Sequence, residues 1–246
     1  MSNGADPRQT RRIGGDRLVP LDGTLNFRDL GGWEVDGGTV AQGRIFRSDR
    51  LNELSDDDHR TLAGLGVRTV CDLRYDRELA VSPSRLPNDL RTIRLPVGAD
   101  LADTDRTIEQ RIADGELTDV TELDVAVGYV RMLDDRAELF GRLVALAADP
   151  DHHAFVVHCT AGKDRTGLAA MLILGALGAD DETIVADYHL TDRYRSARRL
   201  AEVEPTLDRI GVDLDRVRPL FTTPEATMVE TLRLVADRWG SIPAYL

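Results

Sequence analysis

The segment from Phe155 to Gly167 most constrains what this chain can fold into. It reads Phe-Val-Val-His-Cys-Thr-Ala-Gly-Lys-Asp-Arg-Thr-Gly, and the apolar segment Leu168–Leu177 follows it directly. An apolar run, a short polar stretch with one glycine and a second apolar run predict a strand, a tight loop and a helix. Because backbone N–H groups of such a loop and of the helix start converge on one small volume, the segment predicts an anion-binding site.

Two side chains of this loop point to phosphoryl transfer. Cys159 would lie among the N–H donors, and this environment favours the thiolate, the nucleophilic form of cysteine. Arg165 follows after five intervening residues, and a guanidinium can donate two parallel hydrogen bonds to phosphate oxygens. The segment therefore combines a nucleophile, an anion cradle and a bidentate clamp.

A nucleotide-binding Walker loop is the nearest alternative, because Gly162 precedes Lys163 in the segment. That loop needs glycine five positions before Gly162, where this chain has Val157. It also needs serine or threonine after the lysine, where this chain has Asp164. The sequence therefore does not fit the nucleotide-binding loop.

Strand and helix patterns alternate over the first hundred residues. Asp-Gly-Gly within Trp33–Val40 predicts a hairpin, and Arg44–Arg47 reads as a strand. Ser55 begins a capped helix, and Val67–Leu73 and Leu90–Leu95 read as two more strands. Strands connected by helices predict an α/β fold with a mainly parallel central sheet flanked by helices.

The second half of the chain is mainly helical. Tyr129–Ala148 has helical spacing of its apolar residues, and the segment from Arg165 is apolar on nearly every side. A helix that is apolar all round is typical of a buried position, so we expect this one at the centre of the fold. Residues 191–246 form a helical C-terminal part with amphipathic patterns.

One domain over residues 18–246 accounts for the length of the chain, after a flexible leader over residues 1–17. Within it, residues 99–124 are polar and acidic, with scattered apolar positions. Such a long stretch is expected to be a mobile lid or a partly helical insertion.

Charge and cysteine content limit the partners and the compartment. A net charge of -12 argues against general nucleic-acid binding and requires local positive charge for any anionic substrate. Two cysteines imply no disulfide framework, and a required free thiol suits a reducing compartment. The leader has no apolar core, and the longest apolar run is too short to span a membrane. We therefore expect a cytoplasmic protein.

His158–Gly167 resembles the signature of the cysteine-dependent protein tyrosine phosphatase superfamily. The chain is similar to a bacterial subgroup that carries Asn-Phe-Arg-Asp near its start and Gly-Lys-Asp-Arg in its loop. Some members of that subgroup resemble dual-specificity and phosphoinositide phosphatases. Besides the loop, the resemblance is carried by Asn26–Asp29, Arg47-Ser48, Asp72–Arg74 with Glu78, and Val185–Tyr188.

The resemblance implies roles for the loop residues. Cys159 would attack phosphorus and form a phosphocysteine, while Arg165 would stabilise the equatorial oxygens of the transition state. No metal or cofactor is needed, because the arginine and the backbone amides neutralise the phosphate. His158 would help to keep the thiolate, and Thr166 would donate a hydrogen bond to the sulfur. The implied phosphate-binding residues are His158, Thr160, Ala161, Gly162, Lys163 and Thr166.

The general acid is open between two aspartates, because the Trp-Pro-Asp tripeptide of many relatives is absent here. Asp164 is the candidate that the subgroup implies. A helix N-terminus holds its carboxylate ionised, whereas a bound phosphate and a thiolate would favour its protonated form. Asp72 is the second candidate, since it ends a predicted parallel strand, and there it could also simply cap a turn.

Several further residues allow two readings. Lys163 is the only lysine of the chain and could meet a second phosphate or lie solvated in the loop. Cys71 could form a reversible disulfide with Cys159, although a packed core thiol is favoured. Asn26–Asp29 is expected to brace the loop, and Asp187 with Tyr188 to pack a helix.

The sequence thus predicts phosphomonoester hydrolysis, with phosphotyrosine in proteins as the first-choice substrate. A dual-specificity or phosphoinositide phosphatase is the alternative. A phosphate-binding module without turnover and a sulfur transferase of the rhodanese type are two further classes. Thr166-Gly167 at the start of an apolar helix argues against sulfur transfer.

Overall fold

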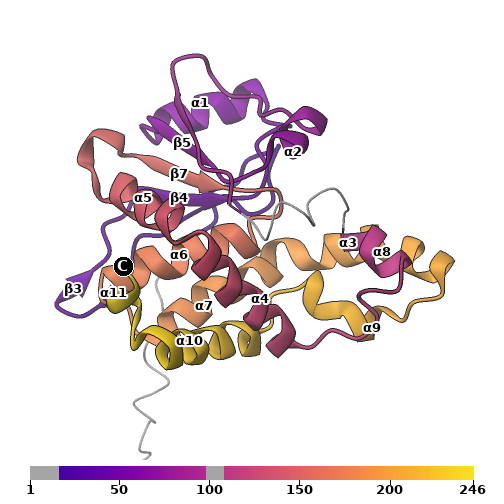
Figure 1. The fold of residues 1–246 in the computed structure, drawn as a ribbon. Coiled ribbons are helices and arrows are strands. Elements are labelled where there is room, and N and C mark those ends of the chain that lie inside the picture. Colours follow the sequence, from indigo (N-terminus) through magenta and orange to yellow (C-terminus); the bar gives the residue numbers. More distant parts are fainter. Residues whose placement is uncertain (1–16, 98–107) are drawn as a thin grey trace, which may run out of the picture.

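A sheet of five strands carries the loop that follows Phe155. The computed structural model describes residues 17–97 and 108–246, and Figure 1 shows this sheet between layers of helices. In spatial order its strands are β1 (Arg28–Asp29), β4 (Ile45–Ser48), β7 (Phe155–His158), β5 (Thr69–Asp72) and β6 (Arg91–Arg94).

The sheet is mainly parallel, as expected, because only β1 runs antiparallel to its neighbour. Ser48 of β4 and Asp72 of β5 both pair in register with His158 of β7. The three central strands therefore end at one edge, where the loops that follow them meet. This is the edge at which open α/β sheets bind their ligands.

The central strand separates two hydrophobic cores. Phe155 and Val157 belong to one core and Val156 to the other, because successive side chains of a strand point to opposite faces. Helix α1 (Asp56–Gly64) adds Leu62 to the core on the Val156 side. The predicted cap of this helix is present, since Ser55 and Asp58 form a reciprocal capping box.

Helix α6 (Asp164–Ala176) fills the other core. Every residue from Thr166 to Gly175 is buried, which confirms the expected central helix. Helix α5 (Ala137–Ala148) lies beside it, and the layer beneath α6 contains α4 (Glu122–Asp135), α7 (Asp181–Thr191) and α10 (Glu225–Trp239) (Figure 1). The remaining short elements here are the hairpin β2 (Glu34–Val35) with β3 (Gly38–Thr39), α2 (Asp76–Val81), η3 (Pro150–His152) and α11 (Ile242–Tyr245).

A third hydrophobic cluster joins the helices that extend to the right in Figure 1. These are α3 (Ile108–Ala113), α8 (Ala197–Ile210), α9 (Leu214–Val217) and η5 (Arg218–Leu220), and η4 (Asp192–Ser196) connects α7 to α8. The buried members of the cluster are Ile112, Val203, Leu207, Val217 and Phe221. The expected lid over residues 99–124 lies partly outside the described residues, and its described part forms α3, the segment that follows it and the start of α4.

Two boundaries differ from those expected. The helical spacing of Tyr129–Ala148 belongs to two helices rather than one, because Arg136 leaves the helical conformation at φ -127° and ψ 26°. The first of them starts earlier, since Thr121 and Asp124 form a capping box. Most of the expected leader lies outside the described residues, but Arg17 is buried, with its guanidinium over the Trp33 ring.

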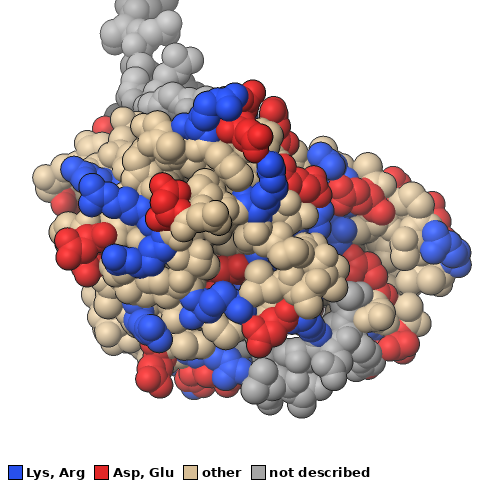
Figure 2. Space-filling view, turned by 90° about the horizontal axis from the view of Figure 1, so that it is seen from above, with Lys and Arg blue, Asp and Glu red and all other residues tan. Residues whose placement is uncertain are grey.

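The surface mixes charges of both signs. Figure 2 shows acidic and basic side chains interspersed on the face seen from above, without a continuous basic patch. None of the helices formed by residues 17–97 and 108–246 is long and apolar enough to cross a membrane.

Leu172→Ala tests whether α6 is the main packing element. Leu172 is fully buried, and truncating such a leucine lowers the free energy of unfolding by about 2–5 kcal/mol. Leu177→Ala is the matched control, because Leu177 ends the same helix with 46% of its surface exposed. Its expected cost is about 0.5 kcal/mol or less. Urea denaturation measures both, and equal losses would contradict this account of the core.

Candidate active site

The loop after β7 folds back on its cysteine. The Gly162 N–H donates a hydrogen bond to the Cys159 Sγ at 3.3 Å. Gly162 has a φ of +64°, and a Cβ there would lie 2.7 Å from backbone atoms of Ser48 and Asp49. Both the conformation and the close approach require glycine at this position.

Buried polar groups hold the same glycine from behind. The Gly162 carbonyl accepts hydrogen bonds from Arg47 Nη2 at 2.8 Å and from Asn26 Nδ2 at 3.2 Å. The Asn26 side chain thus braces the loop as the sequence predicts, and Arg47 from β4 adds a second support.

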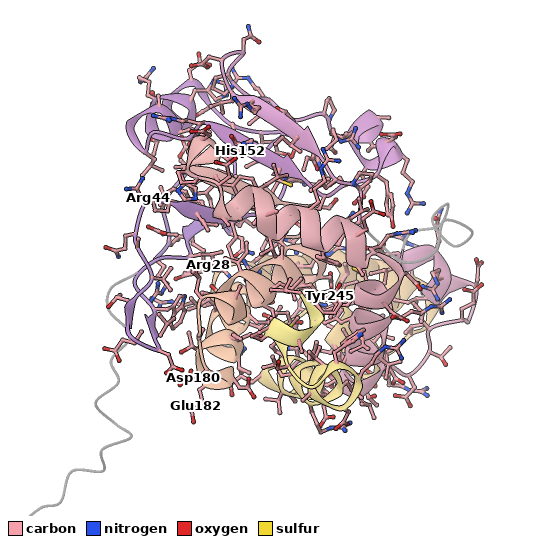
Figure 3. All side chains as sticks on the ribbon, turned by 60° about the vertical axis from the view of Figure 1, so that its left-hand side comes forward. Arg28, Arg44, His152, Asp180, Glu182 and Tyr245 are labelled. Atoms are coloured by element: carbon pink, nitrogen blue, oxygen red, sulfur yellow. The ribbon has the colours of Figure 1, made fainter. Side chains whose placement is uncertain are left out.

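Asp187 of α7 completes this support. Its carboxylate accepts a hydrogen bond from the Arg47 guanidinium and lies 3.5 Å from Arg28 Nε. Figure 3 shows Arg28 in the interior, between the strands and the helices. Burial alone would raise the pKa of Asp187, but the two guanidinium groups outweigh it and lower that pKa. Asp187 is therefore part of a buried charge network and does more than the helix packing expected of it.

Cys159 opens onto a cavity of about 530 Å³ at the carboxyl edge of the sheet. The cavity brings together Cys159, Thr160, Ala161, Lys163, Asp164 and Arg165 of the loop with residues from other elements. Those other residues are Arg50, Arg74, Arg77, Glu78, Val81, Ser82, Ile108, Glu109, Arg195, Arg199, Glu202, Leu220 and Phe221.

Arg165 is oriented by Glu78, a residue to which the sequence reasoning gave no role. Two parallel hydrogen bonds of 2.7 Å join its guanidinium to the two carboxylate oxygens of Glu78. Burial alone would raise the pKa of Glu78, yet the hydrogen bonds from Arg165 and from the Thr160 hydroxyl lower that pKa to about 2. The Arg165 guanidinium is therefore held in a fixed orientation at the cavity.

Asp164 lines the cavity at the first position of α6. Its Oδ1 accepts a 2.5 Å hydrogen bond from the Tyr129 hydroxyl and lies 3.2 Å from Lys163 Nζ. Burial favours its neutral form, but the Lys163 charge and the Tyr129 hydrogen bond together lower the pKa of Asp164. The carboxylate is therefore ionised near pH 7.

Lys163 fits neither reading offered by the sequence. Its Nζ donates hydrogen bonds to the carbonyls of Pro219 and Leu220, at 2.9 and 3.0 Å. The Lys163 side chain is almost fully buried. The two carbonyls belong to the end of η5, which lies beside the loop. The lysine ties the loop to the cavity wall that contains Leu220.

Asp72 ends β5 as predicted, but it does not line the cavity. Both of its oxygens bond the buried guanidinium of Arg74, and Oδ2 lies 3.5 Å from His158 Nε2. His158 in turn contacts the Cys159 carbonyl through Nδ1 at 3.2 Å. Burial lowers the pKa of His158 to about 4, so its ring is neutral near pH 7.

The sequence also suggests contacts of Thr166 and of Cys71 with the Cys159 sulfur. Thr166 is buried, and its hydroxyl has no hydrogen-bond partner among the described residues, so the implied bond to sulfur is not formed here. Cys71 is a free thiol in the core, and burial raises its pKa to about 12. It pairs in register with Val157, not with Cys159.

Glu78→Gln tests the pairing of Glu78 with Arg165. Removing this carboxylate is expected to lower the free energy of unfolding at neutral pH by about 1.5–3 kcal/mol, the range for hydrogen bonds to charged groups. Because the pKa of Glu78 falls from 4.5 to about 2 on folding, its stabilisation is complete above pH 4.5 and is lost as the pH falls toward 2. The difference between wild type and variant in urea denaturation should therefore shrink on acidification. Glu53→Gln, at an exposed carboxylate, is the control, and a difference for Glu78→Gln that does not change with pH would contradict the assignment.

The sequence matches a family model described as the tyrosine phosphatase family over residues 19–246. The chain is 35% identical over 193 residues to the triple specificity protein phosphatase PtpB of Mycobacterium tuberculosis, an alignment covering 68% of this chain and 67% of PtpB. It is 30% identical over 237 residues to a putative tyrosine-protein phosphatase of Cupriavidus necator, covering 95% of this chain and 84% of that protein.

Among solved structures, the Siw14 catalytic core aligns with a TM-score of 0.41 and 13% identity, over 84% of this chain and 94% of that one. This likeness is too low to bear on function. The family match covers nearly the whole described chain, including the cavity and the loop around Cys159. This chain belongs to the tyrosine phosphatase family, and it is a phosphatase.

Proposed function

We propose that this chain hydrolyses phosphomonoesters through a phosphocysteine at Cys159, with phosphotyrosine in proteins as the first-choice substrate. One observation carries the proposal. Cys159, beside the N-terminus of α6, shares a cavity with a pre-oriented Arg165 and with the carboxyl group of Asp164. Nucleophile, clamp and proton donor thus face the same volume.

In the first step the Cys159 thiolate attacks phosphorus, and the bond from phosphorus to the ester oxygen breaks. Arg165 and the loop N–H groups stabilise the charge on the three equatorial oxygens. Asp164 gives a proton to the leaving oxygen, so that the product leaves as an alcohol or phenol. The bound phosphate dianion and the thiolate raise the proton affinity of Asp164 and so favour its protonated form.

In the second step water attacks the phosphocysteine. Asp164, now a carboxylate, takes a proton from this water, and the phosphorus–sulfur bond breaks. Phosphate is released and the thiolate is restored. The Thr166 hydroxyl is buried next to the loop without a hydrogen-bond partner among the described residues, and we assign it the hydrogen bond to the departing sulfur.

The cavity walls favour an aromatic phosphoester. Val81, Ile108, Leu220 and Phe221 add apolar surface to the polar loop, and a cavity of about 530 Å³ admits a phosphorylated phenol ring. Both cysteines are free thiols, which suits a reducing compartment, and we place the protein in the cytoplasm.

A dual-specificity or phosphoinositide phosphatase is the second candidate. Arg50, Arg195 and Arg199 line the same cavity beyond the loop and could meet a second anionic group. The relative PtpB is described as having triple specificity. Lys163 does not contribute to this reading, because its ammonium is already bonded to two carbonyls.

Cys159→Ser tests the function directly. We expect wild type to hydrolyse a phosphotyrosine peptide and the variant to lose this activity, because serine is not ionised at neutral pH. Cys71→Ser is the matched control and should keep activity, since that thiol lies in the core. Chelator should leave the rate unchanged, because the arginine and the amides carry the phosphate charge.

The substrate panel should include a phosphothreonine peptide and a phosphoinositide beside the phosphotyrosine peptide. A preference for either of these would favour the second candidate. Tight phosphate binding without turnover would support a binding module, and activity on thiosulfate would support sulfur transfer. Equal hydrolysis by wild type and Cys159→Ser would overturn the proposed function.

A further inference from the structure

A chain of three side chains from three helices leads into the site. Tyr188 of α7 lies 2.9 Å, hydroxyl to hydroxyl, from Tyr129 of α4, and Tyr129 lies 2.5 Å from Asp164 Oδ1 at the start of α6. Both tyrosines are buried, and neither belongs to the cavity wall formed by the described residues. No step of the proposed reaction uses them.

The direction of this chain follows from its chemistry. A carboxylate oxygen only accepts hydrogen bonds, so Tyr129 donates to Asp164. A phenol has a single hydrogen, so Tyr129 must accept from Tyr188. Because each bond polarises the next, the Tyr188 hydroxyl strengthens the bond from Tyr129 to Asp164.

Both groups bonded to Asp164 approach the same oxygen. Tyr129 Oη and Lys163 Nζ contact Oδ1, whereas no described residue donates a hydrogen bond to Oδ2. The Asp164 side chain is about one third exposed and lines the cavity. The oxygen available to exchange a proton with a substrate is therefore Oδ2.

We propose that Tyr129 is a positioning residue that holds Asp164 Oδ1, so that the catalytic proton is carried on Oδ2 facing the cavity. Tyr188 acts through Tyr129 by fixing the direction of its hydrogen bond. The inference rests on the proposed function, in which Asp164 is the proton donor.

The proton balance involves Asp164 alone. Oδ2–H protonates the leaving oxygen in the first step, and Oδ2 takes a proton from water in the second. Tyr129 keeps its own proton throughout, because burial and the neighbouring Asp164 carboxylate raise its pKa well above the usual value. Oδ1 stays hydrogen-bonded in both protonation states.

The other groups around Asp164 have separate tasks. Lys163 also contacts Oδ1, but its ammonium is shared with the carbonyls of Pro219 and Leu220. Arg165 is paired with Glu78, and Cys159 carries the nucleophile. Tyr129 is thus the neutral donor committed to the Asp164 carboxyl group.

Tyr129→Phe tests the inference through a series of aryl phosphates of increasing leaving-group pKa. General acid catalysis matters most for the least acidic leaving group. For that substrate we expect the rate constant of the first step, followed as leaving-group release in a single turnover, to fall by about 10- to 100-fold, part of the contribution of a well-placed acid. The loss should shrink steadily as the leaving group becomes more acidic. A plot of the logarithm of this first-step rate constant against leaving-group pKa is therefore steeper for Tyr129→Phe than for wild type.

The pH profile gives a second readout that mere structural damage would not produce. The Tyr129 hydrogen bond lowers the pKa of Asp164, so removing it raises that pKa. The alkaline limb of the pH profile of the first-step rate constant, where the acid loses its proton, should move to higher pH in Tyr129→Phe. Tyr188→Phe should show the same two changes, each smaller.

Tyr245→Phe is the matched control. The Tyr245 hydroxyl donates a 2.8 Å hydrogen bond to the Leu133 carbonyl, so it too contacts α4, but from α11 and outside the cavity (Figure 3). Its loss should leave the slope and the alkaline limb unchanged. Thermal unfolding of all variants establishes that each is folded at the assay temperature.

Asp164→Asn separates failure of the inference from failure of the function. If the plot is steeper than that of wild type for Asp164→Asn but has the wild-type slope for Tyr129→Phe, the role of Tyr129 is overturned and Asp164 remains the acid. A wild-type slope for Asp164→Asn would overturn Asp164 as the acid and the inference with it. Neither outcome changes the test of Cys159.

Discussion

The Gly162 carbonyl is the point on which the geometry of the site depends. Arg47 and Asn26 hold it on the inner side of the loop. The carbonyl and the following N–H of a planar trans peptide point in opposite directions. Because the Gly162 carbonyl points toward Arg47 and Asn26, the Lys163 N–H points away from them. At the same residue the Gly162 N–H bonds the Cys159 sulfur. One glycine thus links the buried charge network to Cys159.

That network is built from charges that could not be buried singly. Arg28, Arg47 and Asp187 come from two strands and a helix, and each is fully buried. Removing one partner of a buried ion pair leaves an uncompensated charge, at a cost of about 3–5 kcal/mol. The loop around Gly162 is therefore held by an arrangement that has little freedom to relax. This rigidity suits a site in which donors must be aimed before the phosphate arrives.

Local positive charge offsets the acidity of the chain as a whole. The net charge is -12, yet the cavity gathers arginines from the strand ends, the loop and the helical extension. Glu78 and Asp164 lie among them as hydrogen-bonded carboxylates. The site can thus attract an anion although the field of the whole protein is unfavourable.

The features that sequence could predict are those encoded by neighbouring residues. Strand, loop and helix around Cys159, the parallel sheet and the central helix α6 all follow from local periodicity and turn chemistry. The roles of Glu78, Tyr129 and Asp187 could not be read from the sequence in this way. Each depends on a contact with a residue far along the chain, which only the assembled fold brings within reach.

For Lys163 and Asp72, too, contacts that form only in the assembled fold could not be predicted from the local sequence. Each stands where a local argument allows a role on substrate. The fold instead gives Lys163 two backbone carbonyls and gives Asp72 the buried guanidinium of Arg74. Of the two candidate acids, only Asp164 reaches the cavity.

The most direct test of the central claim is to capture the covalent intermediate. Wild-type protein mixed with an aryl phosphate and quenched rapidly in denaturant at neutral pH is digested and analysed by mass spectrometry. We expect that, during turnover, the peptide containing Cys159 carries the mass of one added phosphoryl group, which disappears when substrate is exhausted. Turnover with no phosphoryl group on this peptide, or with the group on another residue, would contradict it.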